Sequence, residues 1–243
     1  MKETFRLNLS SFATSSSAQL VGVMNPFTKL PIAGLNEDPE DELRDPLPDD
    51  ILKSIRNSIF GGAKAELQLI WRLLEGTGCR LAEVTGLRVE DVVIENELPH
   101  LVVTWHEARR IKNNASKRAV PLVGDALDAA KEALELAKDR KVLFVSYAGE
   151  NGPGNASQAL MKHVRRVTED TAHAVHSLRH NMKDRLILAE VPEMDQNLIL
   201  GHSLGGVGNR TYGGERAKLK ATTKAMRRAF MAPEAEPVSE AAE

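Results

Sequence analysis

The chain has 243 residues, of which 42% are hydrophobic, and it has a single cysteine, Cys79. This composition predicts one large domain with an ordinary core, and it excludes an internal disulfide or a cysteine-based zinc site. The net charge of −2 is unevenly spread, because residues 1–50 hold four basic and nine acidic residues whereas residues 51–231 hold 28 basic and 21 acidic ones. A basic body with acidic ends is still compatible with binding to nucleic acid, since local potential matters more than total charge.

The N-terminal region has neither a signal peptide nor a membrane-spanning pattern. MKETFRLNLSSFATSSSAQL lacks a continuous apolar stretch, and no apolar run in the chain approaches the roughly 20 residues that a membrane span requires. Residues 36–50, NEDPEDELRDPLPDD, are acidic and rich in proline, which is typical of a linker. We therefore expect a cytoplasmic protein with no membrane partner.

The elements expected after this linker are helices followed by two strands. A first helix should begin near Ile51, capped by Asp49 and Asp50. AKAELQLIWRLLEGTGCR has apolar residues at helical spacing and glycines at its end, and LAEVTGL is a short helix at most. Branched apolar residues predict strands over 100–105 and 118–122, joined by the basic connection HEARRIKNNASK.

The second half of the chain is predicted to be mainly helical. GDALDAAKEALELAKDR reads as a capped helix, KVLFVSY as a strand-like apolar run and NGPGN as a loop. Further helices are expected over SQALMKHVRRV, TAHAVHSLRHNMKDRLILA, MDQNLILGH and GERAKLKATTKAMRRAF. The fold class that follows is α+β, mostly helical with a small antiparallel β-sheet.

The stretch HSLRH gathers basic groups on one helical face. His176, Arg179 and His180 stand at positions i, i+3 and i+4, so a helix brings them together. Zinc is disfavoured, because the paired-histidine motif needs a glutamate where Ser177 stands and because a guanidinium opposes a metal ion. Two interpretations remain: a core histidine beside an exposed arginine, or an anion site in which the guanidinium matches phosphate oxygens.

Four further sequence boxes accompany this one. EGTGCRLAEVTGLRVEDV contains Arg80 with Glu83 one turn on, and RRIKNNASKRAVPL contains Lys112 ahead of VPL. LGHSLGGVGNRTYGG contains His202 and, ten residues later, Tyr212. All five boxes occur in the order typical of the tyrosine recombinases, and over about residues 50–215 the chain resembles the catalytic domain of this phage integrase family. The first box departs slightly from the family pattern, because Cys79 fills a usually aliphatic place.

The resemblance implies a clamp for a DNA phosphate. Arg80 matches the first family arginine, Arg179 the second, and Glu83 the acidic residue that follows the first. These arginines would hold the non-bridging oxygens as negative charge grows on them in the transition state. His202 matches the histidine of the LGH box and would add a third donor.

The resemblance also implies the groups that move protons. Tyr212 matches the nucleophile, and His176 would accept the proton that the phenol loses as it attacks. Lys112 would protonate the departing 5′ oxygen, with Lys117 as the competing candidate. This chemistry requires no metal and no cofactor.

We therefore expect a site-specific DNA recombinase, or integrase, that cleaves and rejoins DNA through a 3′-phosphotyrosine. The alternative is a truncated, catalytically poor module that binds DNA or another recombinase. Double-stranded DNA is the expected partner of a chain that is monomeric when free and tetrameric on paired recombination sites, in the cytoplasm and associated with the nucleoid. The expected domains are a remnant of a preceding core-binding domain plus linker at 1–48, the catalytic domain at 49–231 and an acidic disordered tail at 232–243.

The last predicted helix allows two modes of packing. Leu219, Met226 and Phe230 form an apolar stripe along it. The stripe could pack on its own domain, or it could dock on a neighbouring subunit when the protein assembles on DNA.

Overall fold

The computed structural model describes residues 44–107, 109, 116–202 and 213–231. The chain divides into two units, Met1–Asp41 and Glu42–Glu243, and all the described residues belong to the second unit. Lys112 and Tyr212, two of the expected site residues, lie outside the described residues.

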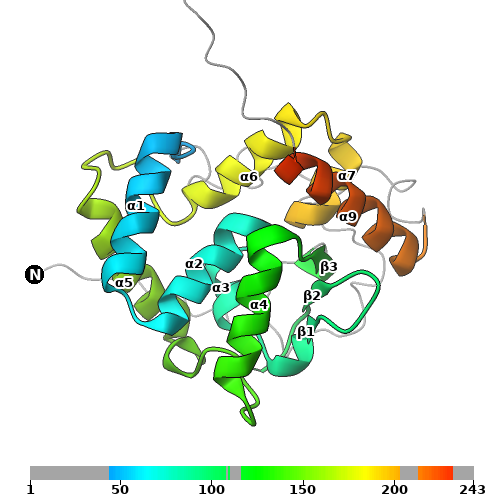
Figure 1. Cartoon of the computed structure of the whole chain (residues 1–243), viewed down its shortest axis with the longest axis horizontal. Helices are drawn as coiled ribbons and strands as arrows, with labels where there is room; N and C mark the ends of the chain where they lie inside the picture. Colours follow the sequence, from blue (N-terminus) through cyan, green and yellow to red (C-terminus); the bar gives the residue numbers. More distant parts are fainter. Residues whose placement is uncertain (1–43, 108, 110–115, 203–212, 232–243) are drawn as a thin grey trace, which may run out of the picture. The chain divides into compact units, whose positions relative to one another are not determined.

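The α+β class is confirmed, with helices predominating (Figure 1). The strands are β1 (Val92–Val93), β2 (His100–Val103) and β3 (Arg118–Pro121), and short 3₁₀ helices occupy Val89–Asp91 and Val145–Tyr147. The α-helices are α1 (Asp49–Gly62), α2 (Ala65–Thr77), α3 (Leu81–Thr85), α4 (Gly124–Ala137), α5 (Gly152–Arg165), α6 (Ser177–Leu188), α7 (Glu193–Leu200) and α9 (Glu215–Met231). No helix in the described part of the chain is both long and apolar enough to cross a membrane.

The three strands form an antiparallel sheet in the order β1-β2-β3. In β2, buried Leu101 and Val103 alternate with the half-buried His100 and Val102. This period of two turns one face of the strand toward the core. Leu101 pairs with Val92 on one side and with Val120 on the other, so β2 is the central strand.

The main core forms where α2 packs along α4, and these two helices lie side by side in the centre of Figure 1. Trp71 in α2 is fully buried, and α4 contributes a buried row of small side chains, namely Ala126, Ala129, Ala130, Ala133 and Ala137. The two helices approach closely, because a Cβ added at Gly76 would lie 2.6 Å from the Cβ of Ala126. Small residues at this contact thus set the spacing of the helices that support the site.

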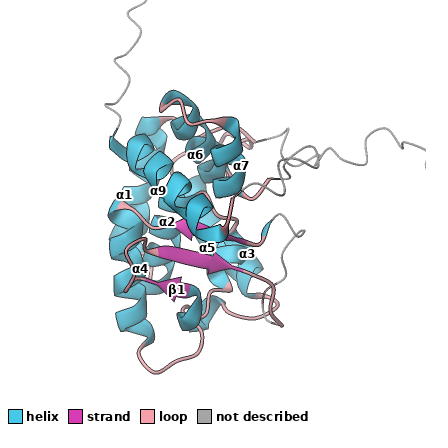
Figure 2. Ribbon diagram, turned by 90° about the vertical axis from the view of Figure 1, so that its right-hand side faces the viewer, coloured by secondary structure: helices cyan, strands magenta, loops and turns pink. Residues whose placement is uncertain are grey.

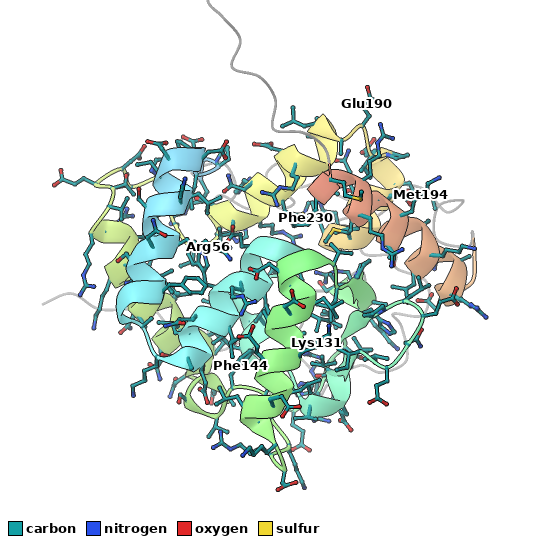
Figure 3. All side chains as sticks on the ribbon, viewed as in Figure 1. Arg56, Lys131, Phe144, Glu190, Met194 and Phe230 are labelled. Carbon is teal, nitrogen blue, oxygen red and sulfur yellow. The ribbon has the colours of Figure 1, made fainter. Side chains whose placement is uncertain are left out.

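A second cluster joins α6, α7 and α9, which gather together in Figures 1 and 2. Leu219 and Met226 of α9 are buried, and the helix packs on β3, α6 and α7 of the same chain. Phe230, labelled in Figure 3, packs against this cluster and lies 4.5 Å from the Arg185 guanidinium. In this chain the stripe therefore packs on its own domain.

Several local predictions were wrong. The expected side-chain caps do not form, because α1 begins at Asp49 itself with Pro48 at its N-cap, and Val123 stands at the N-cap of α4. NGPGN is not a loop throughout, because Gly152 begins α5 and Pro153 stands in the first turn, where its missing N–H costs nothing. KVLFVSY forms no strand: its buried Leu143 and Phe144 fill the core, and Val145–Tyr147 is a 3₁₀ helix. The helix expected from residue 171 begins only at Ser177.

Candidate active site

Arg80 lies between the end of α2 and the start of α3. Helix α2 ends at Gly78, which adopts a left-handed conformation with φ of 64° and lets the chain turn sharply. The Arg80 backbone N–H then donates to Glu83 Oε2 at 2.8 Å, which caps the first turn of α3. The Arg80 side chain is 25% exposed and lies 3.3 Å from Glu83 Oε1, so its guanidinium is held at the surface of the site.

Glu83 is buried and forms a two-pronged ion pair with Arg118 at the start of β3. Arg118 Nη1 and Nη2 donate to Glu83 Oε1 and Oε2 at 3.1 and 3.0 Å. Burial alone would raise the pKa of Glu83, but the charge and hydrogen bonds of Arg118, together with the Arg80 N–H, lower this pKa to about 2. Glu83 is therefore ionised at neutral pH, and it connects Arg80 to Arg118 in β3.

Arg118 was not among the expected site residues, although its position in the sequence carries a signal. In the strand RAVPL, Arg118 has the same parity as the buried Val120, which puts a charge on the inward face. Arg118 also donates through Nε to the carbonyl of Ile199 at 2.8 Å, so it connects β3 to the end of α7. The space it needs depends on Gly201, where an added Cβ would lie 2.7 Å from Arg118 Nη1.

Arg179 is 6% exposed, so the interpretation of it as an exposed charge was wrong. Its Nη1 donates to the carbonyl of Gly78 at 2.8 Å, and its Nη2 donates to the carbonyl of Leu200. Burial, together with the neighbouring charges of Arg80 and Arg118, lowers the pKa of Arg179 to about 10. The side chain stays charged at neutral pH, and the ends of α2 and α7 hold it in place.

The two expected catalytic histidines lie at helix ends around these arginines. His176 is half-buried just before α6, and its ring centroid lies 5.4 Å from that of His180 in an edge-to-face arrangement. His202 is half-buried and follows Gly201, which ends α7 in a left-handed conformation. Its backbone N–H donates to the Asn197 carbonyl at 3.0 Å, which fixes the chain at this point.

The described part of the site is rich in positive charge. Arg80, Arg118 and Arg179 are close enough to influence one another, and Glu83 is the carboxylate that holds two of them. Within the described ranges, no group of three or more histidine, cysteine or carboxylate residues could hold a metal ion. Lys117 is exposed beside Arg118. Such an arrangement suits an anion with several oxygens, such as a phosphate.

Comparisons with known proteins agree with this description. The model of the phage integrase family matches residues 48–212. The tyrosine recombinase XerC of Neisseria meningitidis serogroup B is 29% identical over 141 residues, which cover 55% of this chain and 43% of that protein. XerD of Corynebacterium glutamicum is 32% identical over 139 residues, covering 54% of this chain and 42% of that protein. The chain thus matches less than half the length of these relatives.

Solved structures share the fold. The XerA recombinase has a TM-score of 0.51 and 18% identity, over 80% of this chain and 65% of that one. The Tn1549 transposon integrase, solved in complex with transposon right end DNA, has a TM-score of 0.50 and 19% identity, over 78% of this chain and 67% of that one.

Proposed function

Because the chain belongs to the phage integrase family, we propose that it is a site-specific recombinase that breaks and rejoins DNA through a tyrosine. The observation that carries this proposal is the convergence of Arg80 and Arg179 around the buried pair of Glu83 and Arg118. An isolated surface arginine would need no such support. A buried, hydrogen-bonded guanidinium is prepared in advance to bind an anion.

The proposed reaction replaces one phosphate ester by another. Tyr212 Oη forms a bond to phosphorus, the bond from phosphorus to the 5′ oxygen breaks, and the product is a 3′-phosphotyrosine. His176 accepts the phenolic proton, and Lys112 donates a proton to the departing 5′ oxygen. A second 5′-hydroxyl reverses these steps and rejoins the strands, so the cycle consumes no cofactor.

The arginines act on the charge that develops in this reaction. The pentacoordinate transition state carries more negative charge on its non-bridging oxygens than the phosphodiester does. Arg80 and Arg179 bind these oxygens, and His202 adds a third donor. Interactions that strengthen in the transition state are those that accelerate the chemical step.

The wider organisation belongs to the same proposal. Double-stranded DNA is the partner, and the chain is monomeric when free and a homo-tetramer on paired sites in the cytoplasm, at the nucleoid. Residues 49–231 are the catalytic domain, which follows an acidic linker and precedes the acidic residues 232–243. Lys117 competes with Lys112 for the role of general acid.

Covalent trapping tests the proposal. The full chain is incubated with a pool of duplex oligonucleotides, randomised in sequence around a central nick. Cleavage next to the nick releases a short fragment, so the protein stays attached to DNA. We expect an adduct that resists SDS with the unaltered chain and none with Tyr212→Phe, which keeps the ring but loses the nucleophilic oxygen.

The outcomes separate the two candidate functions. Absence of the adduct together with tight retention of the duplexes contradicts the recombinase and supports the binding module. An adduct that persists in Tyr212→Phe contradicts the assignment of the nucleophile. Lys112→Ala and Lys117→Ala, compared on the sequence recovered from the adduct, then decide which lysine protonates the leaving group.

A further inference from the structure

Besides Arg118 and Arg179, a further buried arginine, Arg109, joins several elements. The side chain of Arg109 is 0% exposed and lies 3.2 Å from Asp91 Oδ2. Its Nε donates to the carbonyl of Thr104 at 2.9 Å and its Nη2 to that of Val102 at 3.2 Å, both on or just after β2. Its Nη1 reaches the carbonyl of Glu83 at 3.4 Å. One guanidinium therefore joins the chain after β2 to the short helix that carries Glu83.

The backbone of Arg109 is fixed as firmly as its side chain. The N–H of Arg109 donates to the carbonyl of His106 at 2.9 Å, and the N–H of His106 donates back to Arg109 at 3.2 Å. His106 Nε2 lies 2.9 Å from the carbonyl of Gly86, which follows α3. His106 and Arg109 are thus each attached to the α3 region, through the carbonyls of Gly86 and Glu83.

The neighbouring chain makes room for this arginine. A Cβ added at Gly86 would lie 2.9 Å from the Cβ of Arg109 and 3.0 Å from its Cγ and Cδ. Gly86 has φ of −89°, which any residue can adopt, so glycine is required here for space and not for backbone conformation. A methyl group at position 86 would therefore clash with the Arg109 side chain and displace it.

Burial of the Arg109 guanidinium costs desolvation free energy, which a purely structural role would not require. Asp91 is its carboxylate partner, and both side chains have lost most of their hydration. Burial lowers the pKa of Arg109 even though Asp91 and Glu83 act to raise it. A well-packed apolar side chain commonly stabilises such a position as well or better, so the buried ion pair points to a need for fixed geometry.

We propose that Arg109 is a positioning residue that fixes the start of the lysine-bearing connection relative to the Arg80 and Glu83 box. Lys112 follows Arg109 by three residues in the sequence, so the fixed position of Arg109 limits how far Lys112 can lie from the helix that carries Glu83. This inference rests on the proposed recombinase activity and extends it. Arg109 touches no reacting atom and acts through Lys112, whose task is to protonate the 5′ oxygen.

The leaving group provides a readout that a general loss of structure would not give. On the duplex recovered by trapping, the 5′ oxygen at the cleavage point is replaced by sulfur. A thiolate departs without a proton, so the sulfur duplex bypasses the step assigned to Lys112. Adduct formation is timed on both duplexes for the full chain with Arg109→Lys, which keeps the charge but loses the planar fork.

We expect Arg109→Lys to slow cleavage of the oxygen duplex by on the order of tenfold to a hundredfold, since small misplacements of a catalytic group cost this much. The rate on the sulfur duplex should stay within about threefold of the unaltered chain, because general-acid catalysis no longer contributes there. Gly86→Ala, which displaces Arg109 without removing it, should give the same pattern. Arg140→Lys, at a side chain that is 52% exposed, is the matched control and should leave both rates unchanged.

Each result bears on the proposal, with rates measured at a temperature where circular dichroism shows each variant folded. Equal losses on the two duplexes would mean that Arg109 supports the arginine clamp or the fold, and the proposal would be wrong. Unchanged rates on both duplexes would also overturn it. Failure of the unaltered chain to form any adduct would instead count against the recombinase activity itself, so the two failures are distinguishable.

Discussion

Replacing Glu83 with glutamine should destabilise the fold and do so in a pH-dependent way. The carboxylate is 3% exposed and pairs with Arg118, whose side chain is 5% exposed. The fold lowers the pKa of Glu83 from 4.5 to about 2. A difference of this size corresponds to about 3 kcal/mol of folding free energy at neutral pH, at about 1.4 kcal/mol for each pKa unit.

The sign of the pH dependence follows from the direction of the shift. Because the folded-state pKa is lowered, the stabilisation is fully present above the unfolded-state value near 4.5 and is lost as the pH falls toward 2. Glu83→Gln removes the charge and leaves the Arg118 guanidinium buried without its carboxylate, a change that typically costs about 3–5 kcal/mol. At pH 3 the difference between the two proteins should be less than half of its value at pH 7.

Urea denaturation followed by circular dichroism at pH 7, 5 and 3 measures these differences. The matched control is Glu90→Gln, because Glu90 pairs with Arg88 at 2.9 Å but its side chain is 72% exposed. Such surface pairs contribute less than about 1 kcal/mol. If Glu83→Gln costs no more than Glu90→Gln, or if its cost is the same at pH 3 as at pH 7, the buried ion pair does not stabilise the fold.

Three further outcomes are expected. Arg179→Lys should slow adduct formation on the nicked duplex by about 100–1000-fold, since an ammonium lacks the forked geometry, and a rate near that of the unaltered chain would contradict the clamp. Gly78→Ala should lower the free energy of unfolding by about 1–3 kcal/mol, because φ is 64° and an added Cβ would lie 2.7 Å from Met182 Cγ in α6. Gly61→Ala is the control and should not lower the free energy of unfolding, because an added Cβ there would meet no atom within 4 Å. Acrylamide should quench the emission of Trp105, which is 63% exposed, and spare that of Trp71, which is 0% exposed; loss of the quenchable component in Trp105→Phe verifies the assignment.

Much of the fold could be predicted because its signals are local. The spacing of apolar residues in α2 and of alanines in α4 predicts helices with one buried face. Gly78 and Gly201 end α2 and α7 in left-handed conformations, as glycines after an apolar periodic run usually do. The alternation in β2 likewise reflects one buried face.

The departures arise where tertiary contacts decide the structure. KVLFVSY has the composition of a strand, yet Leu143 and Phe144 are buried without a ladder, apart from one isolated bridge between Arg88 and Val142. A short apolar run specifies burial but not the conformation that achieves it. NGPGN contains turn residues, but Pro153 is as well suited to a first helical turn as to a loop.

For the site, the sequence reveals residue types but not their partners. Arg80, Glu83 and Arg179 could be singled out by their boxes, since the box pattern is itself the family resemblance. Arg118 has a local signal, since it shares the inward face of its strand with Val120, but its pairing with Glu83, 35 positions earlier, could not be predicted. The burial of Arg109 was equally hidden, because Arg109 stands in a polar, basic stretch that reads as solvated connection.

The positive charges of Arg80, Arg118 and Arg179 repel one another, and this repulsion would favour binding of an anion between them. Glu83 neutralises Arg118, but Arg80 and Arg179 remain close to one another, and burial together with this repulsion lowers the pKa of Arg179 to about 10. An oxyanion placed between the guanidiniums would convert the repulsion into attraction, and the gain would rise with the charge on its oxygens. The carbonyls of Gly78 and Leu200 already hold Arg179 in position, so little further ordering accompanies binding. In the proposed reaction, these guanidiniums would stabilise the more highly charged transition state more than the phosphodiester ground state, which is the condition for catalysis.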